Sequence, residues 1–307
     1  MADALSGILP LLILQVLRIN LEYVSIKYLK STLWIAAVGM PLAGISEVLA
    51  KPQLEIGVAG AGISSAAYPS SSVTSNRGFI VPWFVYRSEK VQVKDGGVKL
   101  IAYQNDWLTV DVGIGGSLNA DTSITPIREG MPDIDFIFEA GPRFDVSIKD
   151  DSTGAWRDRV NWVTAYRFAV STDFKRLDYR GPLLNTELVY RKDGIGDNRL
   201  SFDVSLGATW AEERLQDYFF EVAPEFVTSD RARFDAQAGF LGLDLSAGIQ
   251  FQPTKRVSAF VGVGVSSFDG SRNEDSPLFE EDLNTRVIAA LSWEIYRSKK
   301  LVTASGE

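Results

Sequence analysis

Strict alternation of apolar and polar residues is the feature of this sequence that most constrains its fold. From Ile134 to Ile148 nearly every second residue is apolar, and most of the residues between them are charged or small. Successive side chains of a β-strand point to opposite faces of the sheet, so this stretch predicts a strand with one apolar and one charged wall. The same alternation recurs in 200–210, 241–251, 257–266 and 283–295. The chain is therefore expected to be all-β.

Two all-β architectures produce such alternation, and strand length separates them. A soluble periplasmic sandwich uses strands of about 5–6 residues, whereas a membrane barrel needs about 9–11. Several alternating runs reach eleven residues or more. Aromatic residues near the predicted strand ends suit the two membrane interfaces; they are Trp83, Trp107, Trp156, Trp210, Trp293 and Tyr296. We therefore predict a transmembrane antiparallel up-and-down β-barrel in a bacterial outer membrane, with the sandwich as the alternative.

The segments that can form strands number twelve. They are 54–63, 79–87, 90–95, 97–103, 107–118, 133–149, 156–171, 178–191, 199–211, 233–251, 256–267 and 283–296. Short and mostly longer connections alternate between them, as in bacterial barrels with both termini in the periplasm. This count needs a tight hairpin at Lys94–Gly97, where Asp-Gly and Gly-Gly are suitable turn residues. A single bulged strand there would leave ten strands.

The first fifty residues are expected to hold an N-terminal extension and a signal peptide. Lys27 and Lys30 precede an apolar run, and Val48 and Ala50 are suitable at the −3 and −1 positions, so cleavage is expected after Ala50. A second apolar run ahead of these lysines is unusual, and one explanation is a true start downstream of Met1. A membrane anchor is the alternative, but both runs are shorter or more interrupted than a spanning helix requires. The barrel is then expected over 51–296 and a polar tail over 297–307.

Composition excludes several chemistries. The sequence contains no histidine and no cysteine, which removes Ser-His and Cys-His nucleophile pairs as well as the usual zinc ligands. The net charge of −8 lies entirely on residues 51–307, and no basic patch suggests a nucleic-acid partner. The glycines of 57–62 are not followed by the Lys-Ser/Thr of a phosphate loop. Glu280-Glu281-Asp282 lacks the spacing of a calcium loop. No enzyme activity, catalytic residue, cofactor or metal is expected.

A set of short motifs in order along the chain resembles the MipA/OmpV family of outer-membrane proteins. The motifs are Gly57–Gly62 with Tyr68, Val81–Arg87, Gly130–Asp135 with Glu139–Pro142, Gly207–Ala211 with Tyr218-Phe219, and Asp275–Leu278. The resemblance implies a scaffold that bridges a lytic transglycosylase and a penicillin-binding protein in peptidoglycan assembly. It supplies no catalytic motif. One departure is the end of the chain, where Trp293, Ile295 and Tyr296 are followed by a polar tail instead of a terminal aromatic residue.

The polar walls of two neighbouring predicted strands form the candidate site. Asp133, Asp135, Glu139 and Arg143 share one face of the first strand, and Arg157, Arg159 and Arg167 share one face of the second. Together they could line a lumen that conducts or binds a small charged solute. The other interpretation is that they form interior ion pairs that only neutralise buried charge, as is common in small barrels. A narrow pore or solute-binding barrel is therefore the alternative to the scaffold.

Overall fold

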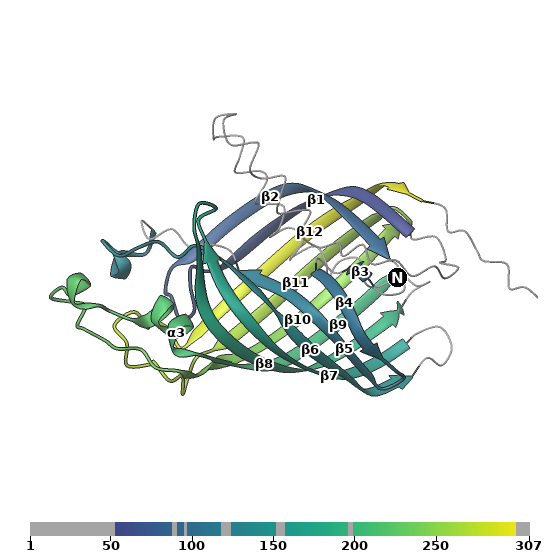
Figure 1. Cartoon of the computed structure of the whole chain (residues 1–307). Helices are drawn as coiled ribbons and strands as arrows, with labels where there is room; N and C mark the ends of the chain where they lie inside the picture. The colour runs from purple at the N-terminus through teal and green to yellow at the C-terminus, as the bar shows by residue number, and fades with distance from the viewer. Residues whose placement is uncertain are drawn as a thin grey trace, which may run out of the picture.

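The computed structural model describes residues 53–87, 91–94, 97–117, 124–151, 157–195 and 199–298, which form twelve strands. The strands are β1 (Gln53–Ala66), β2 (Thr74–Arg87), β3 (Val91–Lys94), β4 (Gly97–Gln104), β5 (Leu108–Ser117), β6 (Phe136–Asp151), β7 (Arg157–Thr172), β8 (Leu177–Gly194), β9 (Leu200–Ala211), β10 (Gly239–Thr254), β11 (Val257–Ser267) and β12 (Leu283–Arg297). Each strand pairs antiparallel with its neighbours in sequence, and β1 pairs with β12 to close a barrel (Figure 1). The predicted up-and-down barrel is confirmed.

The strand count follows from how β3 and β4 pair. Val91–Lys94 and Gly97–Gln104 form an antiparallel pair whose last partners are Lys94 and Gly97. They are two strands of a hairpin and not one bulged strand, so twelve strands are present and the ten-strand alternative is wrong. The expected signal peptide, its cleavage point and all but the first two residues of the expected tail lie outside the described residues.

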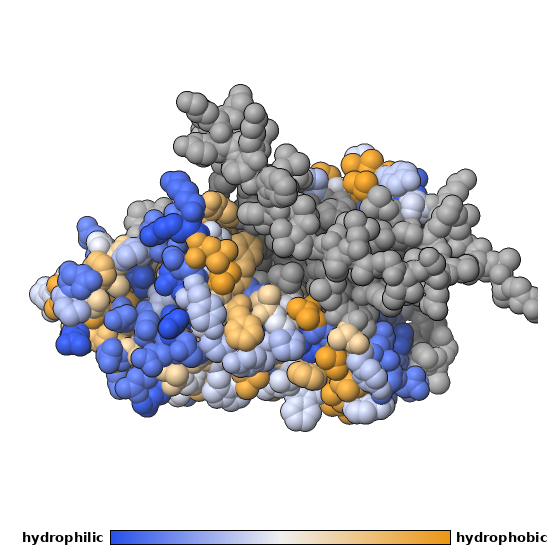
Figure 2. All heavy atoms as spheres, viewed as in Figure 1, coloured by the Kyte–Doolittle hydropathy of each residue, from blue (hydrophilic) through white to orange (hydrophobic). Residues whose placement is uncertain are grey.

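The apolar side of the strands faces outward wherever the structure describes their side chains. Most of the large exposed hydrophobic residues occupy alternate positions of the strands, such as Leu243, Leu245, Ile249 and Phe251 of β10. Gly242, Asp244, Ser246, Gly248 and Gln250 alternate with them and face inward. The hydrophobic surface in Figure 2 lies largely along the strands, and hydrophilic side chains gather at the loop end. A soluble protein buries such residues, so this wall is suited to lipid.

The two ends of the barrel differ. Short connections join strands at the end that carries both chain termini of the barrel, for example between β4 and β5 and between β10 and β11. The segments 67–73, 124–135, 212–238 and 268–282 all lie at the other end, where Figure 1 shows the helix α3 (Glu213–Phe220). The 3₁₀ helices η6 (Pro126–Arg128) and η7 (Pro224–Phe226) belong to the same segments. Among the described residues, no helix is long and apolar enough to cross a membrane.

Two expected strand starts were placed too early. β6 begins at Phe136 and not at residue 133, and β10 begins at Gly239 and not at residue 233. Residues 233–238 belong to the loops instead: Phe234 forms an isolated bridge with Val222, and Ala236 is buried. The segment 212–232, expected to be a plain connection, contains α3. Its signal was present, since Glu212 is a helix cap and Leu215 and Phe219 have helical i, i+4 spacing.

Most of the predicted interface aromatics can be located. Trp107, Trp293 and Tyr296 are exposed at the short-turn end, and Trp210 is exposed at the loop end beside Phe240, with ring centroids 5.7 Å apart. The side chains of Trp83 and Trp156 lie outside the described residues. These four rings are positioned as expected for the two interfaces.

Glycines on the inner wall make room for large neighbours. A Cβ on Gly207 would lie 3.1 Å from Cβ of Glu187, and one on Gly264 would lie 3.0 Å from Nη2 of Arg286. A narrow barrel is filled by alternating small and large side chains, which accounts for the glycines that follow the alternating pattern.

Candidate functional site: the charged lumen and the loop cap

Arg143 of β6 is the centre of the inner charge network. Its guanidinium lies 3.5 Å from the carboxylate of Asp111 on β5 and 2.9 Å from that of Asp145. Asn161 of β7 donates to the other oxygen of Asp145 at 2.5 Å. The Asp111 side chain is only 1% exposed, so the cation neutralises a carboxylate that has lost most of its water.

Three further ion pairs lie on the inner faces of β6 to β8. Arg167 donates to a carboxylate oxygen of Glu139 at 3.3 Å. Arg159 and Arg191 both bind Asp193, the second at 3.1 Å. The predicted site residues Glu139, Arg143, Arg159 and Arg167 are therefore on the inner wall, and each has an opposite charge beside it.

The other three predicted site residues lie away from this network. Arg157 is at the short-turn end, where it pairs with Asp150, and its side chain is 49% exposed. Asp133 and Asp135 precede β6 at the loop end. Asp133 is exposed, and the backbone amide of Asp135 donates to the hydroxyl of Tyr218 at 2.6 Å.

Several inner-wall charges were not singled out from the sequence. Asp244 of β10 lies 3.5 Å from Arg286 of β12 and accepts a hydrogen bond from Ser266 at 2.8 Å. Glu187 of β8 and Asp203 of β9 also face inward. The alternation that identified Glu139 and Arg143 would have found these residues too, because all of them occupy the polar positions of alternating strands.

The loop end holds a hydrophobic core, which we call the loop cap. Leu215, Phe219 and Phe220 of α3 pack against inward-facing residues near the strand ends, which are Ile137, Ala169, Leu183 and Ala211. Tyr68 and Phe279 join this cluster from two other segments, and Phe234 joins it from the segment that contains α3. A second cluster contains Met131, Val222 and Leu278. Apolar side chains from four segments therefore fill this mouth of the barrel.

Two buried arginines hold the loop cap together. Nη1 of Arg128 donates to the carbonyl oxygen of Phe219 at 2.9 Å, and its guanidinium lies 5.5 Å from the ring centroid of Tyr68. Arg231 donates to the carbonyl oxygens of Phe226 at 2.7 Å and Ile127 at 2.6 Å. Burial lowers the pKa of Arg128. No periodic pattern marks these arginines, so the sequence analysis missed them.

Tyr68 connects the first loop to the last. Its hydroxyl donates to the carbonyl oxygen of Leu278 at 2.8 Å and lies 3.2 Å from a carboxylate oxygen of Glu280. Burial, and next the Glu280 carboxylate, raise the pKa of Tyr68. Ser276 adds a bond to α3, because its hydroxyl donates to the carbonyl oxygen of Phe220 at 2.6 Å.

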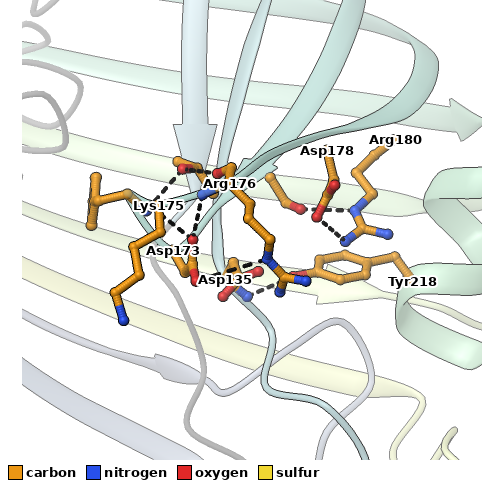
Figure 3. A network of polar contacts seen from close by, with 10 residues as sticks. Asp135, Asp173, Lys175, Arg176, Asp178, Arg180 and Tyr218 are labelled. Atoms are coloured by element: carbon orange, nitrogen blue, oxygen red, sulfur yellow. Dashed lines mark hydrogen bonds and ion pairs between the residues drawn. The ribbon is translucent and has the colours of Figure 1, made fainter.

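A polar network ties α3 to the β7–β8 hairpin (Figure 3). The guanidinium of Arg180 lies 3.8 Å from the ring centroid of Tyr218 and donates to Ser171 at 2.8 Å. The Asp173 carboxylate accepts the backbone amides of Arg176 and Lys175, and these bonds lower its pKa. Burial is the main cause that raises the pKa of both Asp135 and Tyr218.

The solvent side of α3 is acidic. Glu213, Asp217 and Glu221 follow one another at helical i, i+4 spacing, where like charges repel. Burial, and then the carboxylates of Glu221 and Glu213, raise the pKa of Asp217 to about 6. In the part of the chain that the structure describes, no group of acidic side chains is arranged to hold a metal ion.

A closed barrel with apolar side chains outside, ion pairs inside and one mouth filled by loops is the architecture of an outer-membrane β-barrel protein. The sequence matches the family described as MltA-interacting protein MipA over residues 56–295, which is most of the chain and nearly all of the barrel. The chain therefore belongs to the MipA family, and its location is the bacterial outer membrane.

Solved structures give similarities of fold only. An outer-membrane channel from Pseudomonas putida F1 is 11% identical, with a TM-score of 0.36 over 83% of this chain and 99% of that one. A bacterial polysaccharide outer-membrane secretin is 10% identical, with a TM-score of 0.34 over 81% and 100%. The outer-membrane protease OmpT from Escherichia coli is 6% identical, with a TM-score of 0.28 over 82% and 99%. No curated protein matches the sequence significantly.

Proposed function

We propose that this barrel is a non-enzymatic outer-membrane scaffold that bridges a lytic transglycosylase and a penicillin-binding protein in peptidoglycan assembly. The observation that carries the proposal is the loop cap, in which Phe219, Phe220 and Leu215 pack into the outer mouth of the barrel. A barrel filled in this way is suited to anchoring a partner more than to passing a solute. The family description, MltA-interacting protein, supplies the kind of partner.

The partner surface would be the short-turn end. Bacterial barrels place short turns in the periplasm, where the murein enzymes act. In the described part of this end, Lys255 and Arg256 form an exposed basic turn between β10 and β11. A pair of exposed cations at a rim contributes mainly to association rate and salt dependence.

A pull-down tests the scaffold. Purified full-length mature barrel should enrich a murein transglycosylase and a penicillin-binding protein from detergent-solubilised membranes of the same bacterium. The charge-reversed variant Lys255→Glu/Arg256→Glu should weaken that enrichment, and the loop-end variant Arg233→Glu should not. Absence of both enzymes from the wild-type eluate would count decisively against the scaffold.

The absence of enzyme activity is part of the same proposal. The sequence contains no histidine and no cysteine. The chain therefore lacks the general base that most commonly activates a hydrolytic nucleophile, and it lacks the thiolate nucleophile. Incubation of the purified barrel with murein sacculi and with a general peptide library should release no product above that of the heat-denatured protein. Turnover of either substrate would refute the proposal.

A narrow pore or solute-binding barrel is the second candidate, and the charged inner wall favours it. Glu139, Arg143, Arg159 and Arg167 would line such a lumen with charge, as charged residues do in selective pores. The ion pairs that each of them forms with an opposite charge, and the loop cap, weigh against an open channel. Planar-bilayer recordings distinguish the two candidate functions. We expect no conductance steps from the wild type. Steady ion-selective steps would favour the pore over the scaffold.

We also propose that residues 1–50 direct export and are removed, which leaves the barrel with the polar tail 297–307 in the periplasm. The basic Lys27 and Lys30 ahead of an apolar run and the small Ala50 before Lys51 support this processing. N-terminal sequencing of the protein from outer membranes should begin at Lys51. A different first residue would move or remove the cleavage site.

A further inference from the structure

Arg214 lies beside an aromatic ring on the outside of the barrel. Its guanidinium carbon is 5.7 Å from the ring centroid of Tyr179, and the Tyr179 residue is 47% exposed on the outer face of β8. Tyr179 faces outward because of a bulge. Val170 pairs with Tyr179 and Ala169 with Gly181, so Arg180 between them is turned inward, toward Tyr218.

The first turn of α3 is fixed against β8, and this fixes the position of Arg214. The backbone amide of Glu212 donates to the carbonyl oxygen of Pro182 at 3.0 Å. The Glu212 side chain in turn accepts the backbone amide of Arg214 at 3.1 Å. The cation is therefore presented by an ordered scaffold and not by a free loop, which lowers the entropic cost of binding.

Outward-facing aromatic residues set the depth of Arg214 in the membrane. Tyr179, Phe168, Trp210 and Phe240 form a band near the loop end of β7 to β10. Such bands lie at the level of the lipid headgroups. A guanidinium beside Tyr179 is therefore at the level where lipid phosphates lie.

Lys175 supplies a second cation on the same side of the barrel. It is exposed at the tip of the β7–β8 hairpin, and in Figure 3 its side chain points away from the polar network. Below it, Leu177 is 69% exposed on the outer face. Within the described residues, neither Lys175 nor Arg214 has a carboxylate at ion-pair distance.

The other described basic residues of the loop end mostly have internal partners. Arg128 and Arg231 donate to backbone carbonyls, and Arg180 to Ser171. The surrounding loops are acidic: in 268–282, Arg272 is the one basic residue among six acidic ones. Lys175 and Arg214 therefore place positive charge above an apolar and aromatic wall at an end of the barrel whose loops are otherwise acidic.

We propose that Arg214 and Lys175, with the outer surface of Tyr179 and Leu177, bind the phosphorylated headgroup of lipid A in the outer leaflet. The two cations neutralise the phosphates, and the apolar wall below them contacts the acyl chains. This site is independent of the scaffold role, which concerns the opposite end of the barrel.

Native mass spectrometry of the full mature protein in detergent tests the site, with lipid A titrated as the probe. The double variant Lys175→Gln/Arg214→Gln should bind lipid A about thirtyfold more weakly than the wild type. The charge-preserving Lys175→Arg/Arg214→Lys should retain most of the affinity. A matched control, Arg233→Gln/Lys149→Gln, removes the same charge from exposed positions elsewhere and should bind as the wild type does.

Two control ligands distinguish the binding of lipid A from the binding of simpler anions. Dephosphorylated lipid A should bind the wild type and the double variant equally weakly, and inorganic phosphate should not displace lipid A. Equal affinity of the wild type and the double variant for lipid A would overturn the site, as would displacement by inorganic phosphate. Heat-modifiable migration of each variant establishes that the barrel is folded before binding is compared.

Discussion

The carboxylate of Glu212 occupies the place that a side chain on Gly181 would need. Gly181 lies in the β-bulge of β8 with φ of +94°, and the first atom that an added Cβ would meet is Oε2 of Glu212. The same Glu212 caps α3, so one glycine permits both the bulge that turns Arg180 inward and the attachment of the helix that fills the barrel mouth. Local backbone conformation and closure of the lumen are coupled at this contact.

Gly181→Ala should therefore loosen the loop cap. The positive φ costs about 1–3 kcal/mol for a residue with a Cβ, and the displaced Glu212 adds to this. We expect faster proteinase K cleavage within 212–238 of the folded barrel. Gly130→Ala is the matched control, because Gly130 has φ of +79° but no atom within 4 Å of an added Cβ. Equal cleavage of the two variants would show that the Glu212 contact has no effect.

Arg128→Ala should weaken the contact between the segments 124–135 and 213–226. The substitution leaves the buried carbonyl oxygen of Phe219 without its donor, which costs about 1–3 kcal/mol, and opens a cavity beside Tyr68. Amide hydrogen exchange should rise in both segments while the strands stay protected. The exposed Arg233→Ala should change exchange little, and unchanged protection in Arg128→Ala would contradict the assigned role.

The loop cap should be less stable above pH 6 than below pH 4. The pKa of Asp217 is raised to about 6, above its usual value near 4, so the folded cap favours the protonated form. Stability is full below the unfolded pKa and falls as pH rises from about 4 to about 6, where the folded group ionises among Glu221 and Glu213. Hydrogen exchange of 213–220, corrected for the intrinsic rate, should show this fall.

Asp217→Asn should remove most of that dependence and protect the cap at pH 7.5. Glu225→Gln, which neutralises an exposed acid of the same loop, is the control and should preserve the wild-type profile. A pH profile of Asp217→Asn that matched the wild type would assign the effect to another group.

Arg143→Met should destabilise the barrel, whereas Arg157→Met should not. Arg143 is the cation beside the buried Asp111, and its removal should cost about 3–5 kcal/mol because the carboxylate stays desolvated. Arg157 and Asp150 are exposed, and such pairs contribute about 0–1 kcal/mol. Urea unfolding in lipid vesicles should separate the two variants, and adding Asp111→Asn to Arg143→Met should recover part of the loss.

The barrel itself was predictable because its signal is local. Alternation with a period of two depends only on the strand and on the two solvents it separates, so β9, β11 and β12 match their predicted ranges to within a residue or two at each end. The same pattern placed Glu139, Arg143, Arg159 and Arg167 on the polar wall. The predicted start of a strand was wrong where the residues of the preceding loop have no regular pattern that marks the boundary, as before Gly239.

The ion pairs, the bulge and the loop cap were decided by tertiary structure. Tyr68 bonds to Leu278, 210 residues later in the chain, and Arg128 bonds to Phe219 across 91 residues. Such contacts exist only once the closed barrel brings the loops to one end, and no local pattern encodes which loops meet. The sequence by itself determined which side of each strand faces lipid, since that depends on each residue's own polarity. Which charges meet, and what fills the mouth, depended on strand register and loop packing.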